Sequence, residues 1–152
     1  MIFTDPETCA QAWEYFDGSC YKIASESLAF ASARNSCVAQ GADLVKISSE
    51  EENTFLTEKA SDEAWIGLER AQNDPFYWQD GSNVSFKKWK DGLPGSNACV
   101  VLDVNGTWRD SHCSFTPNKY ICERGKHQRK INLFCMCFTL RYMSHLALDP
   151  VS

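Results

Sequence analysis

The tetrapeptide Trp65-Ile66-Gly67-Leu68 is the stretch of this 152-residue sequence that decides its fold. Large apolar side chains with no polar residue between them are typical of a strand that is buried on both faces. We therefore assign Trp65, Ile66 and Leu68 to the core. Core residues of this kind identify a fold without identifying a ligand.

Two helices are predicted before this strand. Residues 27–40 form the first, because Phe30, Ala33, Cys37 and Val38 recur on one face at helical spacing. Gly41 is predicted to end this helix, as glycine commonly does.

The second helix is predicted to begin at Ser48 and Ser49, because Glu51 and Glu52 complete two overlapping capping boxes with them. Its acidic first turn, residues 50–52, suits the positive end of the helix dipole, so these carboxylates are expected to be solvated. Metal binding by the three carboxylates is the alternative, although consecutive residues point in different directions on a helix.

The rest of the pattern consists of short strands, predicted over residues 9–23 as a hairpin-like pair and over 44–47, 76–78, 99–102, 107–109 and 119–123. Asn105-Gly106 is a strong signal for a hairpin turn. Turn residues accumulate between residues 81 and 98, which predicts a long irregular loop, and such a loop inside a compact domain is usually functional. Two early helices followed by short strands predict an α+β domain.

Cysteine usage indicates the compartment. The eight cysteines are spread along the chain without a Cys-x-x-Cys pair, which favours disulfides over a zinc site and implies an oxidising environment. Two sequons point the same way, with Asn83 and Asn105 as predicted glycosylation sites. The chain is therefore expected to be secreted or to be the extracellular part of a membrane receptor.

Charge and hydropathy exclude other classes of protein. A formal net charge of −5 and a pI near 5.2 disfavour nucleic acid as a partner, because a negative chain repels a phosphate backbone. No stretch reaches the roughly 20 apolar residues that a membrane span needs, so no direct span is expected. No signal peptide is visible after Met1, which indicates a fragment or a misplaced start.

The sequence divides into a domain over residues 9–124 and a C-terminal extension over residues 125–152. The extension begins with a basic run at 126–130 that is expected to be solvated, and it is predicted to be disordered or loosely packed. A dimerising pair, Cys135 and Cys137, is one alternative for its role. A metal site that uses His127 or His145 is another.

The motifs around the deciding tetrapeptide follow one another in a specific order: Phe30-x-x-Ala33-x-x-x-Cys37, Gly41-Ala42-x-Leu44-Val45-x-Ile47, Trp78-x-Asp80-Gly81, Trp89, Cys99-Val100, Trp108-x-Asp110, Cys113 and Tyr120-Ile121-Cys122-Glu123. Over about residues 9–124 the chain thereby resembles the C-type lectin-like domain family in its long form. The resemblance implies two helices packed on two small antiparallel sheets with a long irregular loop. It also implies three disulfides: Cys9 with Cys20, Cys37 with Cys122, and Cys99 with Cys113.

Family members that bind sugar do so through calcium held by the long loop, and calcium takes about six to eight oxygen ligands. The resemblance aligns the first ligand triplet with Leu93-Pro94-Gly95, which has no side-chain oxygen, and the last with Trp108-Arg109-Asp110, where an arginine stands at a ligand position. Asp110 and Asn97 remain as donors, and Asp91 is an alternative, displaced ligand. No resident cofactor is therefore expected, and calcium is disfavoured; Asp110 is the metal ligand if calcium binds.

The loop also carries cations beside an aromatic residue. Trp89 is expected to pack in the core, as the family pattern suggests, and the lysines either solubilise the loop or contact a ligand. The candidate ligand-binding residues are Lys87, Lys88, Lys90, Asn97, Arg109 and Asp110.

The resulting functional hypothesis is an extracellular C-type lectin-like domain that recognises a carbohydrate or protein ligand without calcium. The alternative is a calcium-dependent carbohydrate-binding lectin with atypical ligands. An enzyme is not expected, because His112 lies beside Ser111 and Cys113 in an extended strand whose neighbours point to opposite faces. The resemblance also implies an oligomer or a part of a multi-domain receptor.

Overall fold

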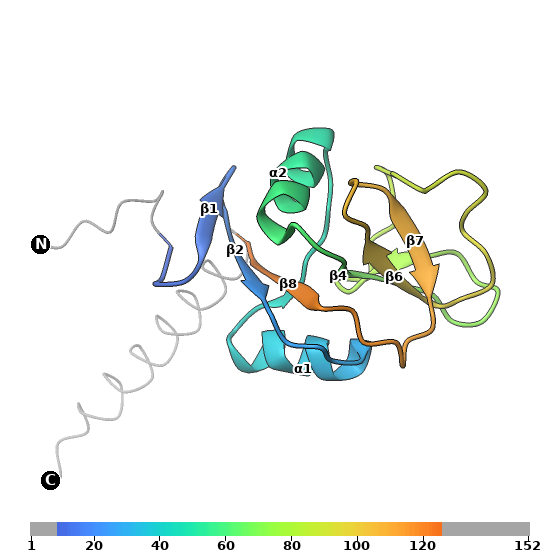
Figure 1. Ribbon diagram of the computed structural model, residues 1–152, viewed down its shortest axis with the longest axis horizontal. Coiled ribbons are helices and arrows are strands. Elements are labelled where there is room, and N and C mark those ends of the chain that lie inside the picture. The colour runs from blue at the N-terminus through green and yellow to red at the C-terminus, as the bar shows by residue number, and fades with distance from the viewer. Residues whose placement is uncertain (1–8, 126–152) are drawn as a thin grey trace, which may run out of the picture.

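The computed structural model describes residues 9–125 (Figure 1). Two helices, α1 and α2, lie on opposite sides of the central strands. The elements are, in chain order, β1 (Glu14–Phe16), β2 (Ser19–Ala24), α1 (Phe30–Ala39), β3 (Asp43–Leu44), α2 (Glu50–Ala60), β4 (Ala64–Glu69), β5 (Tyr77–Trp78), β6 (Cys99–Leu102), β7 (Trp108–Ser111) and β8 (Lys119–Arg124). The extension that was predicted over residues 125–152, with its two cysteines, lies outside the described residues except for its first residue.

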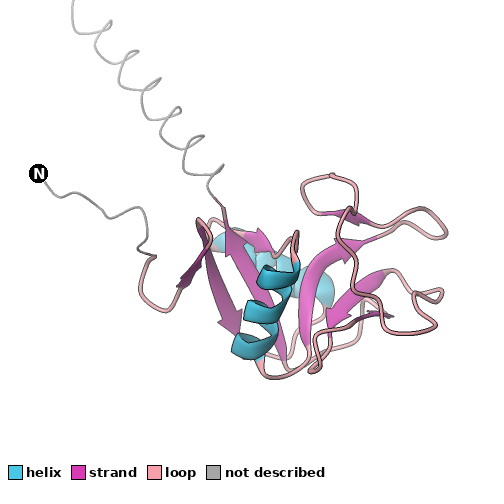
Figure 2. Ribbon diagram, turned by 90° about the horizontal axis from the view of Figure 1, so that it is seen from above, coloured by secondary structure: helices cyan, strands magenta, loops and turns pink. Residues whose placement is uncertain are grey.

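The strands, magenta in Figure 2, form one mixed sheet. Their order is β1-β2-β8-β4-β6-β7, with β3 added to β8 and β5 added to β4. Every pairing is antiparallel except that between β4 and β8, where Ala64 faces Lys119 and Trp65 faces Tyr120. The predicted α+β class is confirmed. The two small antiparallel sheets that we expected are joined into one sheet by this parallel pairing, which connects strands far apart in the sequence.

The deciding tetrapeptide occupies β4 in the middle of this sheet, and its three large side chains are fully buried as predicted. Its glycine has a steric reason. The Gly67 backbone nitrogen donates to the Val45 carbonyl at 2.8 Å, and a Cβ atom on Gly67 would lie 2.5 Å from the Leu44 carbonyl oxygen. Only glycine lets the chain after β3 approach β4 this closely.

The core consists of two groups of side chains on either face of the sheet. On the α1 side, the Trp65 ring meets Phe30 edge to face at 5.4 Å. On the other side, Trp78 and Trp108 make the same kind of contact at 5.6 Å. Such edge-to-face pairs add to the burial of the rings and fix their orientation.

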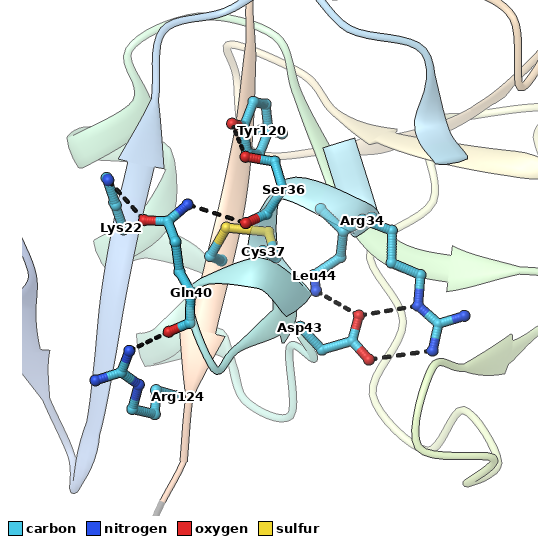
Figure 3. The surroundings of a disulfide bond; sticks show 10 residues. Lys22, Arg34, Ser36, Cys37, Gln40, Asp43, Leu44, Tyr120 and Arg124 are labelled. Carbon is cyan, nitrogen blue, oxygen red and sulfur yellow. Dashed lines mark hydrogen bonds and ion pairs between the residues drawn. A yellow bond between two sulfur atoms is a disulfide. The ribbon is translucent and has the colours of Figure 1, made fainter. Parts of the chain in front are cut away.

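Three disulfides link distant parts of the described chain, and all three match the expected pairs: Cys9–Cys20, Cys37–Cys122 and Cys99–Cys113. Figure 3 shows the surroundings of Cys37, where polar contacts surround a buried sulfur bridge. The Ser36 and Tyr120 hydroxyls lie 2.8 Å apart, and Arg34 donates to both carboxylate oxygens of Asp43. The Cys37–Cys122 disulfide therefore joins α1 to β8, and polar side-chain contacts lie around it.

The first helix is shorter than predicted and has a narrower buried face. It begins at Phe30 and ends at Ala39, with Gly41 following at a φ of 70°. The expectation that Val38 lies on the buried face is wrong, because Val38 is 54% exposed. The face that packs on the sheet consists of Phe30, Ala33 and Cys37.

The second helix begins with the predicted capping box. The Ser49 hydroxyl accepts from the Glu52 backbone nitrogen at 3.2 Å, and the Glu52 carboxylate accepts from the Ser48 backbone nitrogen at 2.7 Å. The expectation of three solvated carboxylates is wrong for one of them. Glu52 is only 7% exposed, because the Tyr21 hydroxyl donates to its carboxylate from β2 at 2.6 Å.

Candidate functional site

The irregular segment, residues 79–98, connects β5 to β6 and lies at the end of the molecule away from β1 (Figure 1). Its middle is attached to β7. The Trp108 backbone nitrogen donates to the Lys88 carbonyl at 2.7 Å, and the Lys90 nitrogen donates to the Trp108 carbonyl at 2.9 Å. Trp89 packs on Trp108 and on Phe76, with ring centroids 5.9 and 5.0 Å away, so it lies against the core but is only partly buried.

The last part of the segment lies against Asp110 of β7. One oxygen of the Asp110 carboxylate accepts from the Gly95 backbone nitrogen at 2.7 Å, and the other accepts from the Asn97 nitrogen at 2.8 Å. Asp110 is 6% exposed. Asp110 and Asn97, the two predicted oxygen donors, thus lie close together. They are joined by a hydrogen bond from the Asn97 backbone nitrogen to the Asp110 carboxylate. The Leu93-Pro94 peptide bond just before this contact is cis.

These amide contacts also govern the charge of Asp110. Burial by itself would raise the pKa of this carboxyl. The hydrogen bonds from the Gly95 and Asn97 backbone outweigh burial, and they hold the pKa of Asp110 below its ordinary value. Asp110 is therefore a buried carboxylate that is ionised and engaged on both oxygens.

Arg70, which follows β4, contacts the same stretch from the other side. Its Nε donates to the Asn97 carbonyl at 3.0 Å, and its Nη2 donates to the Gly95 carbonyl. Its guanidinium also lies over the Phe76 ring, 4.4 Å from the centroid. Arg70 was not among the predicted site residues, because a single arginine after a strand has no sequence pattern that would mark it.

The candidate cations do not form one surface. Lys87 is exposed, Lys88 pairs with Glu50, and Lys90 lies 3.9 Å from Asp103. Arg109 alternates with Asp110 along β7 and therefore points to the opposite face of the sheet, where it donates to Glu63 at 2.6 Å and lies 5.2 Å from the Phe115 ring centroid. The structure thus separates Arg109 from the lysines with which it was grouped.

The positions that the resemblance aligns with the family's calcium ligands offer few side-chain oxygens near Asp110. Both Asp110 oxygens already accept backbone hydrogen bonds, and Leu93 and Gly95 offer no side-chain oxygen. Within residues 9–125 there is no group of three or more His, Cys, Asp or Glu side chains arranged to hold a metal ion. Calcium prefers about six to eight oxygens, mostly from carboxylates and carbonyls.

A concave region lies between the first turn of α2, β2, β3, the end of β8 and the first two residues of the irregular segment, Gln79 and Asp80. This groove has a volume of about 650 Å³ and contains the carboxylates of Glu52 and Glu123. Burial raises the pKa of Glu123, and the nearby Glu52 adds to the effect. Ser19 and the Lys46 backbone nitrogen donate to Glu123 at 3.0 and 3.1 Å, so both carboxylates have partners.

The remaining predicted residues lie at separate places. Asn83 and Asn105 are both exposed, and they stay predictions as glycosylation sites. His112 is exposed, Ser111 is buried, and Cys113 is in a disulfide, so these three do not make a catalytic arrangement.

The disulfide-linked mixed sheet with its irregular segment is the architecture of a known class of non-enzymatic binding module. The sequence profile of the Lectin C-type domain matches residues 26–124. The chain belongs to the C-type lectin domain family. The three disulfides, with the additional N-terminal pair Cys9–Cys20, fit an extracellular location.

Three known proteins are similar to this chain in sequence, and two of them have solved structures that can be compared with it. The human low affinity immunoglobulin epsilon Fc receptor is 34% identical over 123 residues, which cover 77% of this chain and 38% of the receptor. The cow C-type carbohydrate-recognition domain of CD23, solved in the presence of a GlcNAc2Man3 oligosaccharide, is 31% identical with a TM-score of 0.75, covering 78% of this chain and 97% of that one. A Ca2+-dependent type II antifreeze protein in its Ca2+-free form is 30% identical with a TM-score of 0.70, covering 76% and 99%.

The chain spans less than half the length of curated relatives that it matches, such as the human immunoglobulin epsilon Fc receptor. No helix in the described part of the chain is long and apolar enough to cross a lipid bilayer.

Proposed function

We propose that this chain is an extracellular recognition domain that binds a glycan through the surface of the irregular segment, without calcium. The likeness to the cow domain described with an oligosaccharide supports a glycan ligand. The three disulfides support an extracellular site of action, because such bonds persist in an oxidising environment. Extracellular proteins are the second class of ligand to test.

The observation that carries the calcium-independent part is the engagement of Asp110. Its two oxygens accept from two backbone amides at 2.7 and 2.8 Å. A calcium ion at this place would compete with these two amides for the Asp110 oxygens, and the neighbouring Leu93 and Gly95 supply no side-chain oxygen to complete its ligand shell.

The proposed contact surface consists of the exposed part of the irregular segment. Lys87 is the main proposed contact residue of this surface, because its side chain is exposed and makes no ion pair with any residue between 9 and 125. Lys88 and Lys90 flank it with partners in Glu50 and Asp103. Arg109 is left out of the surface, since it pairs with Glu63 on the other face of the sheet.

The test is a glycan array probed with the disulfide-bonded domain, once in calcium and once in chelator, beside a panel of extracellular proteins. We expect the same glycans to be retained in both buffers. Lys87→Ala is expected to reduce retention severalfold. The matched control is Lys59→Ala, which removes an exposed lysine from α2, paired with Glu14.

A calcium-dependent lectin with atypical ligands is the second candidate. The similarity to an antifreeze protein described as Ca2+-dependent favours it, as does the closeness of Asp110 to Asn97. Retention that disappears in chelator and returns with added calcium would establish this second function and reject the first. Retention by proteins alone would move the ligand class from glycans to proteins.

A further inference from the structure

Two side chains of opposite charge, Asp110 and Arg70, make hydrogen bonds to the backbone of residues 95–97. The Asp110 carboxylate accepts from the two backbone nitrogens of Gly95 and Asn97. The Arg70 guanidinium donates to the two backbone carbonyls of the same residues. Each charge therefore faces the backbone group of opposite polarity: the anion accepts from N–H groups, and the cation donates to C=O groups.

The two charged residues come from strands on either side of β6. Arg70 follows β4, Asp110 lies in β7, and β6 pairs with both strands. Residues 95–97 lie just before β6, which begins at Cys99, and Cys99 is fixed by its disulfide to Cys113. The segment is thus held at the point where irregular backbone becomes sheet.

The two side chains are themselves held in place. The Arg70 backbone nitrogen donates to the Ala98 carbonyl at 2.9 Å, and its guanidinium stacks over Phe76. Asp110 is buried, and a Cβ atom on Gly95 would lie 3.3 Å from its carboxylate, closer than most such contacts. Charge-assisted hydrogen bonds from fixed, partly buried partners are among the stronger polar contacts in proteins.

We propose that Arg70 and Asp110 form a metal-free clamp whose role is to order the irregular segment for ligand binding. The clamp supplies within the chain both the positive and the negative charge that hold the backbone, so segment order needs no bound cation. The consequence for ligand affinity rests on the function proposed above. Segment order itself is measurable without any ligand.

The test is amide hydrogen exchange by NMR on the oxidised domain in chelator. The Gly95 and Asn97 amides are expected to be protected in the unaltered chain. Arg70→Gln and Asp110→Asn should each accelerate their exchange about tenfold or more, the change that about 1.4 kcal/mol of lost stabilisation produces. The amides of Ile66 and Leu68 in β4 report whether the variant remains folded.

Arg34→Gln is the matched control, since Arg34 makes a comparable two-bonded contact with Asp43 beside α1. It is expected to leave exchange in residues 95–97 unchanged. Arg70→Lys keeps the charge but loses the fork of donors, so it should restore part of the protection. The amide proton shifts of Gly95 and Asn97 should also follow the titration of Asp110, which a loop held only by packing would not do.

Three results would overturn the clamp: rapid exchange at Gly95 and Asn97 in the unaltered chain, protection that appears only when calcium is added, or protection that survives both substitutions. A failure to find a glycan would leave these measurements intact. The clamp and the proposed function therefore fail separately.

Discussion

The side-chain oxygen of Asn53 in α2 accepts a hydrogen bond from the indole nitrogen of Trp108 in β7 at 2.8 Å. The amide nitrogen of the same side chain donates to the Gly106 carbonyl, also at 2.8 Å. Asn53 and Trp108 are both buried. One asparagine thus satisfies a donor and an acceptor of the β6–β7 hairpin and fixes α2 against it.

Asn53→Leu is expected to destabilise the domain by about 1–3 kcal/mol, because it leaves the Trp108 indole and the Gly106 carbonyl buried without partners. Urea unfolding followed by tryptophan fluorescence measures the loss. Asn118→Ala is the control, since Asn118 contacts Asp62 on the surface. A loss of the same size in both variants would contradict a special role for the buried asparagine.

Gly67→Ala is expected to cost about 1–3 kcal/mol or more, since the new methyl group would meet the Leu44 carbonyl at 2.5 Å and force β3 and β4 apart. Gly125→Ala adds the same methyl group where the nearest atom is 3.6 Å away, so its effect should stay within about 0.5 kcal/mol. Denaturant unfolding of both variants checks the prediction. Equal midpoints would refute the steric argument.

The disulfides are expected to differ in their effect on unfolding. The Cys37–Cys122 bond closes a separation of 85 residues, and its replacement by two alanines should lower the free energy of unfolding by about 4–5 kcal/mol. The Cys9–Cys20 bond closes a separation of 11, and its loss should cost about 3 kcal/mol or less. A larger loss from the N-terminal pair would show that loop closure does not set the order.

The pH dependence of stability should carry the signature of Asp110. Its folded-state pKa is lowered, after amide hydrogen bonds overcome the opposing effect of burial. Its contribution is therefore fully present above the unfolded pKa of about 3.9 and is lost as the pH falls through the folded pKa. We expect the difference in unfolding free energy between the unaltered chain and Asp110→Asn to shrink below that range. A difference that is constant down to about pH 2 would contradict this assignment.

Most of the fold was predictable because apolar spacing is recorded in the residue types. The disulfide pairing was predictable only through the resemblance to C-type lectin-like domains. The burial of Trp65 and the capping box at Ser49 follow from local rules, and both were confirmed. The parallel pairing of β4 with β8 was not foreseen, because it joins residues 55 positions apart at Trp65 and Tyr120 and leaves no local pattern. Val38 was misplaced for a related reason: helical spacing alone does not define how wide the buried face is.

Less of the candidate site was predictable. That Leu93 and Gly95 offer no side-chain oxygen is evident from their residue types, and the resemblance indicated which positions to examine. The partners of charged residues could not, as the separate positions of Arg70 and Arg109 show. Hydrogen bonds to backbone groups depend on tertiary geometry, which the identity of an arginine does not record. Glu52 was misjudged in the same way, because only the fold brings Tyr21 to its carboxylate.

The strands β2 and β8 run antiparallel beside each other, with Cys20 opposite Arg124. The polypeptide accordingly enters β2 and leaves β8 at the same end of these strands, and residues 79–98 lie on the opposite side of the domain (Figure 1). A domain with this geometry can be attached through either terminus, or inserted into a longer chain, while its irregular segment still points away from the point of attachment.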